Sequence, residues 1–187
     1  MRALTRAVAA LLMATGCANS GQQPTDSIGP PAAAPSGWQT YRDADYAFAI
    51  EFPPDYVIQA EPAQPPASRR PPLRRVRFQQ RDIAAGQFAD REPAQFTVEV
   101  FERIGRQGLR EWLQSEGRLP QGAVVTPVRL EGADEGVRVQ MRQQLAPNDF
   151  VYFARGEYIY ALTPLGEHGD QMLATFRFVS LSVTSPR

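Results

Sequence analysis

Large apolar side chains alternate with small or charged ones in Asp45-Tyr46-Ala47-Phe48-Ala49-Ile50-Glu51-Phe52. This period of two predicts a β-strand with one buried face, because successive side chains of a strand point to opposite sides. The buried face would carry Tyr46, Phe48, Ile50 and Phe52, and the other face Ala47, Ala49 and Glu51. Pro53-Pro54 ends the strand, since proline has no backbone N–H to donate to a sheet.

Further strands are predicted where apolar and β-branched residues lie between turn residues such as Gly, Pro, Asn and Asp. They are expected at 73–80, 95–101, 124–130, 136–145, 150–155 and 157–163. In 136–145 the inward side chains would be Val137, Val139 and Met141. The last four strands follow one another through turns, which predicts an antiparallel meander.

Two segments change to the period of a helix. In 106–116, Leu109, Trp112 and Leu113 stand at i, i+3 and i+4, so this helix would pack on the sheet and end at Gly117. A last helix near 169–176 would present Met172, Leu173 and Phe176 to the core.

The order of these segments predicts the α+β class. We expect an antiparallel β-sheet of about six or seven strands with helices packed on it, because strands and helices occur in blocks. Residues 38–181 have ordinary globular composition and would form one domain, followed by a short tail at 182–187. The 20 basic and 20 acidic residues balance, so nucleic acid is not an expected partner.

The amino-terminal segment has the features of an export signal. Arg2 and Arg6 precede a short apolar run that ends in Ala14-Thr15-Gly16-Cys17. The run is too short for a transmembrane helix, which needs roughly 20 apolar residues. The segment resembles the signal peptide and lipobox of bacterial lipoproteins, with Ala14 in place of the usual leucine. An ordinary secretory signal is the alternative.

The lipoprotein resemblance implies removal of residues 1–16 and a lipid on Cys17, the only cysteine. Two or more acyl chains hold a protein at a membrane almost irreversibly. Because Ala18 follows and not aspartate, the resemblance favours the outer membrane, facing the periplasm, in a diderm cell envelope. The Pro, Gly, Ser and Ala of 17–37 predict a disordered tether.

Four stretches, taken in order, resemble the PsbP/Mog1-like superfamily, which includes bacterial lipoproteins of the DcrB and LpqN type. They are 41–56, with its tyrosine, turn, aromatic strand and proline, then 96–112, 152–162 and Thr175-Phe176-Arg177-Phe178-Val179. The resemblance implies a sheet sandwiched by helices and a binding or assembly role. Characterised members are partners of photosystem II, of a small GTPase and of envelope components, and the family shares no catalytic motif.

Residues 68–77 hold the largest local excess of charge. The candidate contact residues are Arg69, Arg70, Arg74, Arg75 and Arg77. Arginines of this density can bind lipid phosphates or an acidic partner. The alternative is a solvated loop and an edge strand whose charges discourage aggregation.

A second candidate surface carries aromatic side chains. Alternation places Tyr152 and Phe153 on opposite faces, and Tyr158 and Tyr160 on a common face. Core packing with hydroxyls at the rim is one interpretation. The other is a face for a small ligand, formed by Tyr158 and Tyr160.

The single histidine, His168, is a weak candidate for chemistry. Glu167, His168 and Asp170 are close in sequence, but no second histidine or spaced ligand accompanies them. We expect a loop in which Asp170 caps the last helix and places a favourable charge in its first turn. No serine stands in a Gly-x-Ser-x-Gly elbow, and Asp134-Glu135 is expected to be a solvated turn. No metal and no cofactor is therefore predicted.

These observations predict a membrane-anchored envelope lipoprotein that is not an enzyme. It would act as a protein-binding or assembly-accessory module with an envelope protein as its partner. The alternative function is a module that binds a small ligand or lipid on the sheet face. A third possibility is a hydrolase with an unrecognised site.

Overall fold

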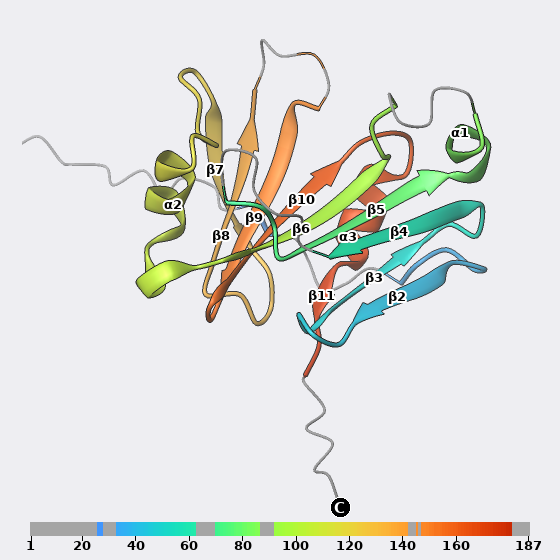
Figure 1. The fold of residues 1–187 in the computed structure, drawn as a ribbon, viewed down its shortest axis with the longest axis horizontal. Helices are drawn as coiled ribbons and strands as arrows, with labels where there is room; N and C mark the ends of the chain where they lie inside the picture. The colour runs from blue at the N-terminus through green and yellow to red at the C-terminus, as the bar shows by residue number, and fades with distance from the viewer. Residues whose placement is uncertain are drawn as a thin grey trace, which may run out of the picture.

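The computed structural model describes residues 26–27, 33–62, 70–86, 92–141, 145 and 147–180. The larger of two sheets has the strand order β1-β7-β8-β9-β10-β6-β5-β4 (Figure 1). Its strands are β1 (Asp26–Ser27), β4 (Tyr56–Pro62), β5 (Arg74–Gln80), β6 (Phe96–Glu102), β7 (Val124–Arg129), β8 (Glu135–Gln140), β9 (Asp149–Arg155) and β10 (Tyr158–Pro164). All neighbouring strands from β7 to β4 are antiparallel, and β1 joins β7 in parallel.

A second layer covers one face of this sheet. It consists of a small sheet in the order β11-β3-β2 and of helix α3 (Gly169–Thr175), which packs against β3 and β10. The small strands are β2 (Gln39–Asp43), β3 (Phe48–Phe52) and β11 (Arg177–Phe178). Central β3 is joined to β11 across the register pair Ala49 and Arg177, so the two ends of the domain meet here.

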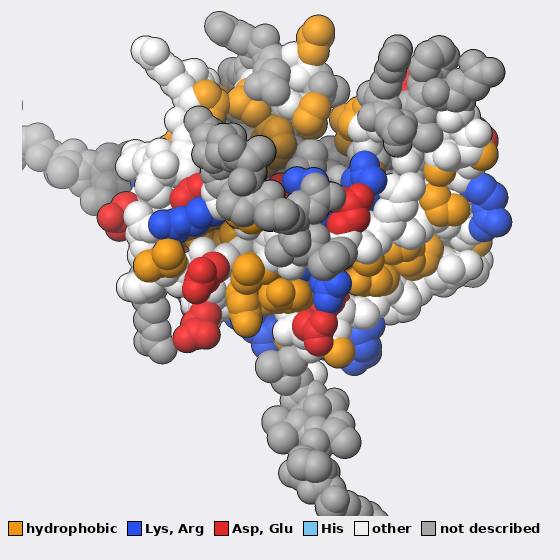
Figure 2. Space-filling view, viewed as in Figure 1, with side chains coloured by type: hydrophobic (Ala, Val, Ile, Leu, Met, Phe, Trp, Pro, Cys, Tyr) orange, Lys and Arg blue, Asp and Glu red, His pale blue; other side chains and the backbone are white. Residues whose placement is uncertain are grey.

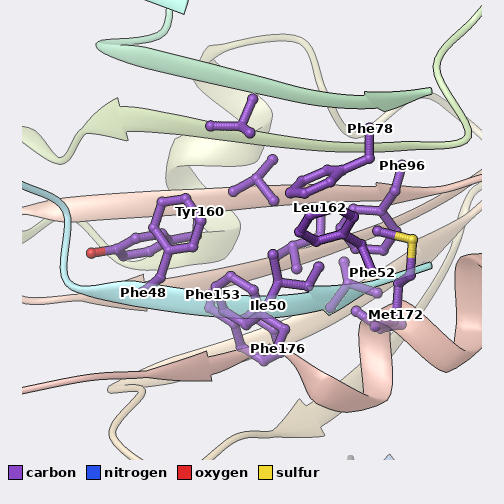
Figure 3. Packing of buried hydrophobic residues seen from close by; sticks show 14 of the residues in the cluster. Phe48, Ile50, Phe52, Phe78, Phe96, Phe153, Tyr160, Leu162, Met172 and Phe176 are labelled. Carbon is purple, nitrogen blue, oxygen red and sulfur yellow. The ribbon is translucent and has the colours of Figure 1, made fainter. Parts of the chain in front are cut away.

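The main core fills the space between these two layers. Figure 3 shows the rings of Phe48, Phe153, Tyr160 and Phe176 packed together, with Ile50 of β3 pointing into the same cluster. The rings of Phe153 and Phe176 are stacked, with centroids 6.2 Å apart. Each such side chain contributes about 1.5–3 kcal/mol when fully buried, so this cluster accounts for much of the stability of the fold.

A smaller core lies on the opposite face of the larger sheet. Helix α2 (Leu109–Ser115) buries Leu109, Trp112 and Leu113 against Phe101 and Tyr152. The short helix α1 (Arg81–Ala84) and the 3-10 turn η1 (Ile104–Arg106) complete the described helical elements. Figure 1 places α2 and α1 at opposite ends of the long axis. Helix α2 therefore covers only one part of its face of the sheet.

The α+β class, the antiparallel sheet of seven strands and the meander from β7 to β10 are confirmed. The placement of Tyr152 and Phe153 in different cores is confirmed as well. Helix α3 presents Met172, Leu173 and Phe176 to the main core, as predicted.

Several boundaries differ from the sequence predictions. The strand expected over 45–52 begins at Phe48, because Ala47 lies in a turn with φ of 51°. The strand expected over 136–145 ends at Gln140, so Met141 is not part of it. The helix expected over 106–116 begins at Leu109, since Gly105 inside the preceding turn has a non-helical φ of 62°. Strands β2 and β4 were not predicted.

The expected tether also differs in one place. Asp26 and Ser27 lie within 17–37, yet they pair with Val128 and Arg129 of β7. The signal segment 1–16, Cys17 and the tail 182–187 lie outside the described residues, so their predicted roles remain predictions.

Candidate binding surfaces

The arginines predicted to form a basic patch are paired with carboxylates. Arg70 Nη1 lies 3.7 Å from Glu116. Arg74 contacts Asp43 at 3.1 Å and Asp45 at 2.8 Å. Arg69 lies outside the described residues. Figure 2 shows blue and red side chains next to one another on the visible face, so opposite charges alternate there.

The remaining two arginines belong to a chain of ion pairs across the larger sheet. Arg77 Nη2 lies 2.7 Å from Glu61, and Arg75 reaches both Glu61 at 4.0 Å and Glu99 at 2.8 Å. Arg118, beyond α2, lies 3.7 Å from Glu99. The guanidinium of Arg118 also stands 4.3 Å from the ring centroid of Phe101, which links the chain to the smaller core.

The structure corrects the expectation that these arginines lie on an edge strand. Strand β5 runs between β4 and β6, and its backbone is paired on both sides. Its side chains alternate, so Val76 and Phe78 enter the main core whereas Arg75 and Arg77 stand on the α2 face.

An open groove of about 390 Å³ lies on this face beside the ion pairs. Its polar lining includes Arg75, Arg77, Thr97 and Glu99 from β5 and β6. Apolar surface is contributed by Pro93, Ala94, Pro147, Phe150 and Leu165. The groove therefore offers donors, acceptors and apolar contacts over several adjacent strands, and we call it the β5–β6 groove.

Tyr158 and Tyr160 share a face, as predicted, but have different surroundings. Tyr160 is buried in the main core, and its hydroxyl donates a 2.8 Å hydrogen bond to the carbonyl oxygen of Tyr46. Tyr158 is half-buried, and its ring meets that of Tyr46 edge to face at 5.4 Å. Both tyrosines line a hollow of about 200 Å³ together with Asp45, Arg155 and Glu157. We call it the tyrosine hollow.

The backbone beside this hollow is held in an unusual conformation. Ala47 is the one described non-glycine residue with positive φ, at 51°, and such a conformation costs of order 1–3 kcal/mol. Its carbonyl oxygen accepts two hydrogen bonds, from Arg155 Nη1 at 3.1 Å and from the Val179 N–H at 2.9 Å. These bonds link the turn to β9 and to the chain after β11.

The resolved pKa shifts among the described side chains belong to tyrosines and one arginine. Burial raises the pKa of Tyr160 to about 12, and burial likewise raises the pKa of Tyr56 to about 12. A hydrogen bond from its guanidinium to Asp149 raises the pKa of Arg138. Each of these groups therefore keeps its ordinary protonation state more firmly at neutral pH.

Asp134 and Glu135 are exposed, as expected of solvated residues, and in addition they hold a buried cation. Arg103 lies 3.2 Å from Asp134 and 2.8 Å from Glu135, and its Nε donates to the Gln107 carbonyl oxygen at 2.7 Å. Glu135 also accepts a 3.0 Å hydrogen bond from the backbone N–H of Leu109. A carboxylate at this point is favourable for the first turn of α2.

His168 is the residue that precedes α3, and Asp170 lies in the first turn of that helix. The predicted cap by Asp170 is wrong, because no side chain makes a capping hydrogen bond at this end of α3. Asp170 lies instead 3.4 Å from Arg138. Nδ1 of His168 lies 3.1 Å from Gln171 Oε1, and its ring packs edge to face with Trp38. Within the described ranges, no three His, Cys, Asp or Glu side chains gather into a possible metal site.

The chain was compared with family models, curated proteins and solved structures. No family model and no curated protein matches the chain. The chain is similar to cyanobacterial PsbP (CyanoP) from Synechocystis sp. PCC 6803, with 13% identity and a TM-score of 0.45. The comparison covers 80% of this chain and 99% of that chain.

Proposed function

We propose that this protein is a lipid-anchored component of a bacterial cell envelope that binds another protein and catalyses no reaction. The observation that carries the proposal is the β5–β6 groove, an open surface of about 390 Å³ on the α2 face of the sheet. The proposal includes membership of the PsbP/Mog1-like superfamily and the accessory role that such membership implies.

The chemistry of the groove suits an extended segment of a partner protein. The chain Arg77–Glu61–Arg75–Glu99 presents both signs of charge in alternation, so it can meet backbone donors as well as acceptors. Phe150 and Leu165 supply apolar contacts at the same site. Interfaces between proteins that also exist apart combine apolar contacts with a polar rim in this way.

The anchor in the proposal rests on the sequence of residues 1–17 alone. Among the described residues, no helix has the length and apolarity required to cross a bilayer. Lipid on Cys17 would concentrate the groove near the membrane and leave the domain itself in the aqueous phase. The outer membrane, with the domain facing the periplasm, is the proposed location in a diderm host.

A photo-cross-linking amino acid at position 97 tests the partner-binding role in cells of the native host. Thr97 lies in the groove, and Thr126 of β7 is a half-buried control at another place on the same sheet. We expect one adduct from position 97 that mass spectrometry identifies as a single envelope protein, and we expect Arg75→Glu to remove it. Identical background adducts from positions 97 and 126 would contradict the proposal.

One observation favours the alternative of a small-ligand module. The two tyrosines predicted to form a ligand face do line a common hollow, and its volume of about 200 Å³ suits a group of few atoms. This size is below that of ordinary drug-sized pockets, which begin at about 300 Å³.

A further inference from the structure

The tyrosine hollow is built from two turns that are far apart in sequence. Tyr46 and Ala47 come from the turn before β3, whereas Glu157 lies in the turn between β9 and β10, flanked by Arg155 at the end of β9 and Tyr158 at the start of β10. The edge-to-face contact of Tyr46 with Tyr158 and the hydrogen bond from Tyr160 to Tyr46 join the two turns. The walls of the hollow are therefore aromatic and belong to the folded core.

The hollow is held in shape before any ligand arrives. Arg155 donates to the Ala47 carbonyl oxygen at 3.1 Å, and Arg74 pairs with Asp45 at 2.8 Å. Ala47 keeps a positive φ of 51° under these constraints. Strained backbone that the surrounding contacts enforce is found preferentially at binding sites. A preformed pocket also lowers the conformational cost of binding.

The hollow carries two carboxylates, of which only one forms an ion pair among the described residues. Asp45 and Glu157 both line it, but Asp45 is paired with Arg74 at 2.8 Å. The guanidinium of Arg155 is already engaged, since it donates to Ala47 and stands 4.6 Å from the ring centroid of Phe178. No described side chain pairs with the carboxylate of Glu157, and Glu102 lies opposite Tyr158 in the register of β6 and β10. A neighbouring positive charge on a ligand would be attracted here.

We propose that the tyrosine hollow binds one aromatic or large aliphatic side chain of a partner protein, next to a lysine or arginine of that partner. The volume of about 200 Å³ accommodates a single side chain against the rings of Tyr46 and Tyr158, which contact each other. Preformed aromatic pockets that accept one anchor residue are typical of the energetic centres of protein interfaces. The inference rests on the proposed partner-binding role only in that the side chain comes from a protein, and it does not depend on the groove or the anchor.

The proposal is tested with three capped dipeptides and the full chain carrying Cys17→Ser, followed by amide chemical shifts. N-acetyl-phenylalanyl-lysine amide should shift the amides of Ala47, Gly156 and Glu157 with a dissociation constant in the millimolar range. Phenylalanyl-glutamate and alanyl-lysine analogues should bind roughly three- to tenfold more weakly, because one lacks the charge and the other the ring.

Two matched substitutions test whether Glu157 causes the preference for lysine. Glu157→Gln should remove most of the preference for lysine over glutamate in the dipeptide, and the exposed control Glu167→Gln should leave it intact. The proposal is overturned if the three dipeptides bind equally, if the shifts fall outside the hollow, or if Glu157→Gln binds like the unchanged protein. Because this measurement needs no cell and no membrane, its failure is separate from failure of the cross-linking at position 97.

Discussion

At the scale of single residues, Arg103 has the most consequential set of contacts. It is buried directly after β6, and it contacts Asp134 in the turn before β8 and Glu135 at the start of β8. Its backbone N–H also donates to the Glu157 carbonyl oxygen at 2.7 Å. Arg103 links the end of β6 to the start of β8 and to the turn between β9 and β10, so it stabilises several connections of the sheet at once.

We expect Arg103→Met to lower the free energy of unfolding by about 2 kcal/mol. Removing one partner of a buried ion pair costs about 3–5 kcal/mol, but Asp134 and Glu135 retain access to water, which reduces the loss. Arg70→Met is the control, since Arg70 itself is exposed in its pair with Glu116 and pairs at the surface contribute about 0–1 kcal/mol. Urea unfolding measures both, and equal losses would show that Arg103 has no special role.

Removing the hydroxyl group of a buried tyrosine should affect the free energy of unfolding differently at Tyr56 and at Tyr160. The Tyr56 hydroxyl has no hydrogen-bond partner within the described part of the chain, whereas Tyr160 donates to Tyr46. We therefore expect Tyr56→Phe to leave the free energy of unfolding unchanged or raise it by up to about 1 kcal/mol. Tyr160→Phe should lower it by about 1 kcal/mol. Thermal and urea unfolding measure both variants. A loss of stability in Tyr56→Phe as large as in Tyr160→Phe would contradict the view that the Tyr56 hydroxyl makes no hydrogen bond.

At the scale of elements, local patterns predicted those strands and helices whose burial follows a clear period. Strand β3 was predicted from the alternation of Phe48, Ile50 and Phe52. Helix α2 was predicted from the helical spacing of Leu109, Trp112 and Leu113. Strand β2 has a mostly exposed pattern, and the outer strand β4 mixes polar with apolar residues, so neither shows strong alternation. The division into two sheets depends on pairs such as Arg177 with Ala49, which no local pattern contains.

In the candidate sites too, the sequence predicted features within one element but not contacts between distant segments. The common face of Tyr158 and Tyr160 was predictable, because both belong to one strand. Their contact with Tyr46, and the positive φ of Ala47, were not predictable, because that turn is distant in sequence. The arginine excess around residue 75 was visible, but its neutralisation by Glu61 and Glu99 depends on the neighbouring strands.

Strand β8 depends on a glycine near its start. A Cβ at Gly136 would lie 2.6 Å from the Val128 carbonyl oxygen and 2.8 Å from the ring of Phe153. Phe153 faces Gly136 in register, so the ring occupies the space that a side chain would need. We expect Gly136→Ala to lower the free energy of unfolding by about 1–3 kcal/mol, because backbone or ring must move.

Gly108→Ala is the matched control for this prediction. Gly108 precedes α2, has a φ of −59°, and has no heavy atom within 4 Å of the added Cβ. It should change the free energy of unfolding by no more than about 0.5 kcal/mol. Urea unfolding of both variants decides the point, and equal effects would mean that β8 can shift away from Phe153 at little cost.

At the scale of the whole molecule, the pairing of β1 with β7 bears on how an anchored domain would stand at a membrane. With lipid on Cys17, the chain from Cys17 to Asp26 can reach at most about 32 Å when fully extended. Six strand spacings separate β7 from β4, which amounts to about 29 Å at roughly 4.8 Å each. The β7 edge of the sheet should therefore lie closer to the bilayer than the β4 edge.

Fluorophores on Glu131→Cys and Ala60→Cys test this orientation in the lipidated protein on vesicles. Both positions are exposed, the first two residues after the end of β7 and the second on β4. The thiol of Cys17 is blocked by its lipid, so only the introduced cysteine reacts. Nitroxide-labelled lipid headgroups should quench position 131 more strongly than position 60.

The same experiment separates the pairing of β1 from the anchor. Ser27→Pro removes a backbone N–H and restricts the chain where it pairs with Arg129, so the difference in quenching should shrink while the protein stays on the vesicles. Equal quenching at both positions before that substitution would contradict the pairing. Release of the protein from the vesicles would instead contradict the anchor, since two acyl chains are enough to hold it there.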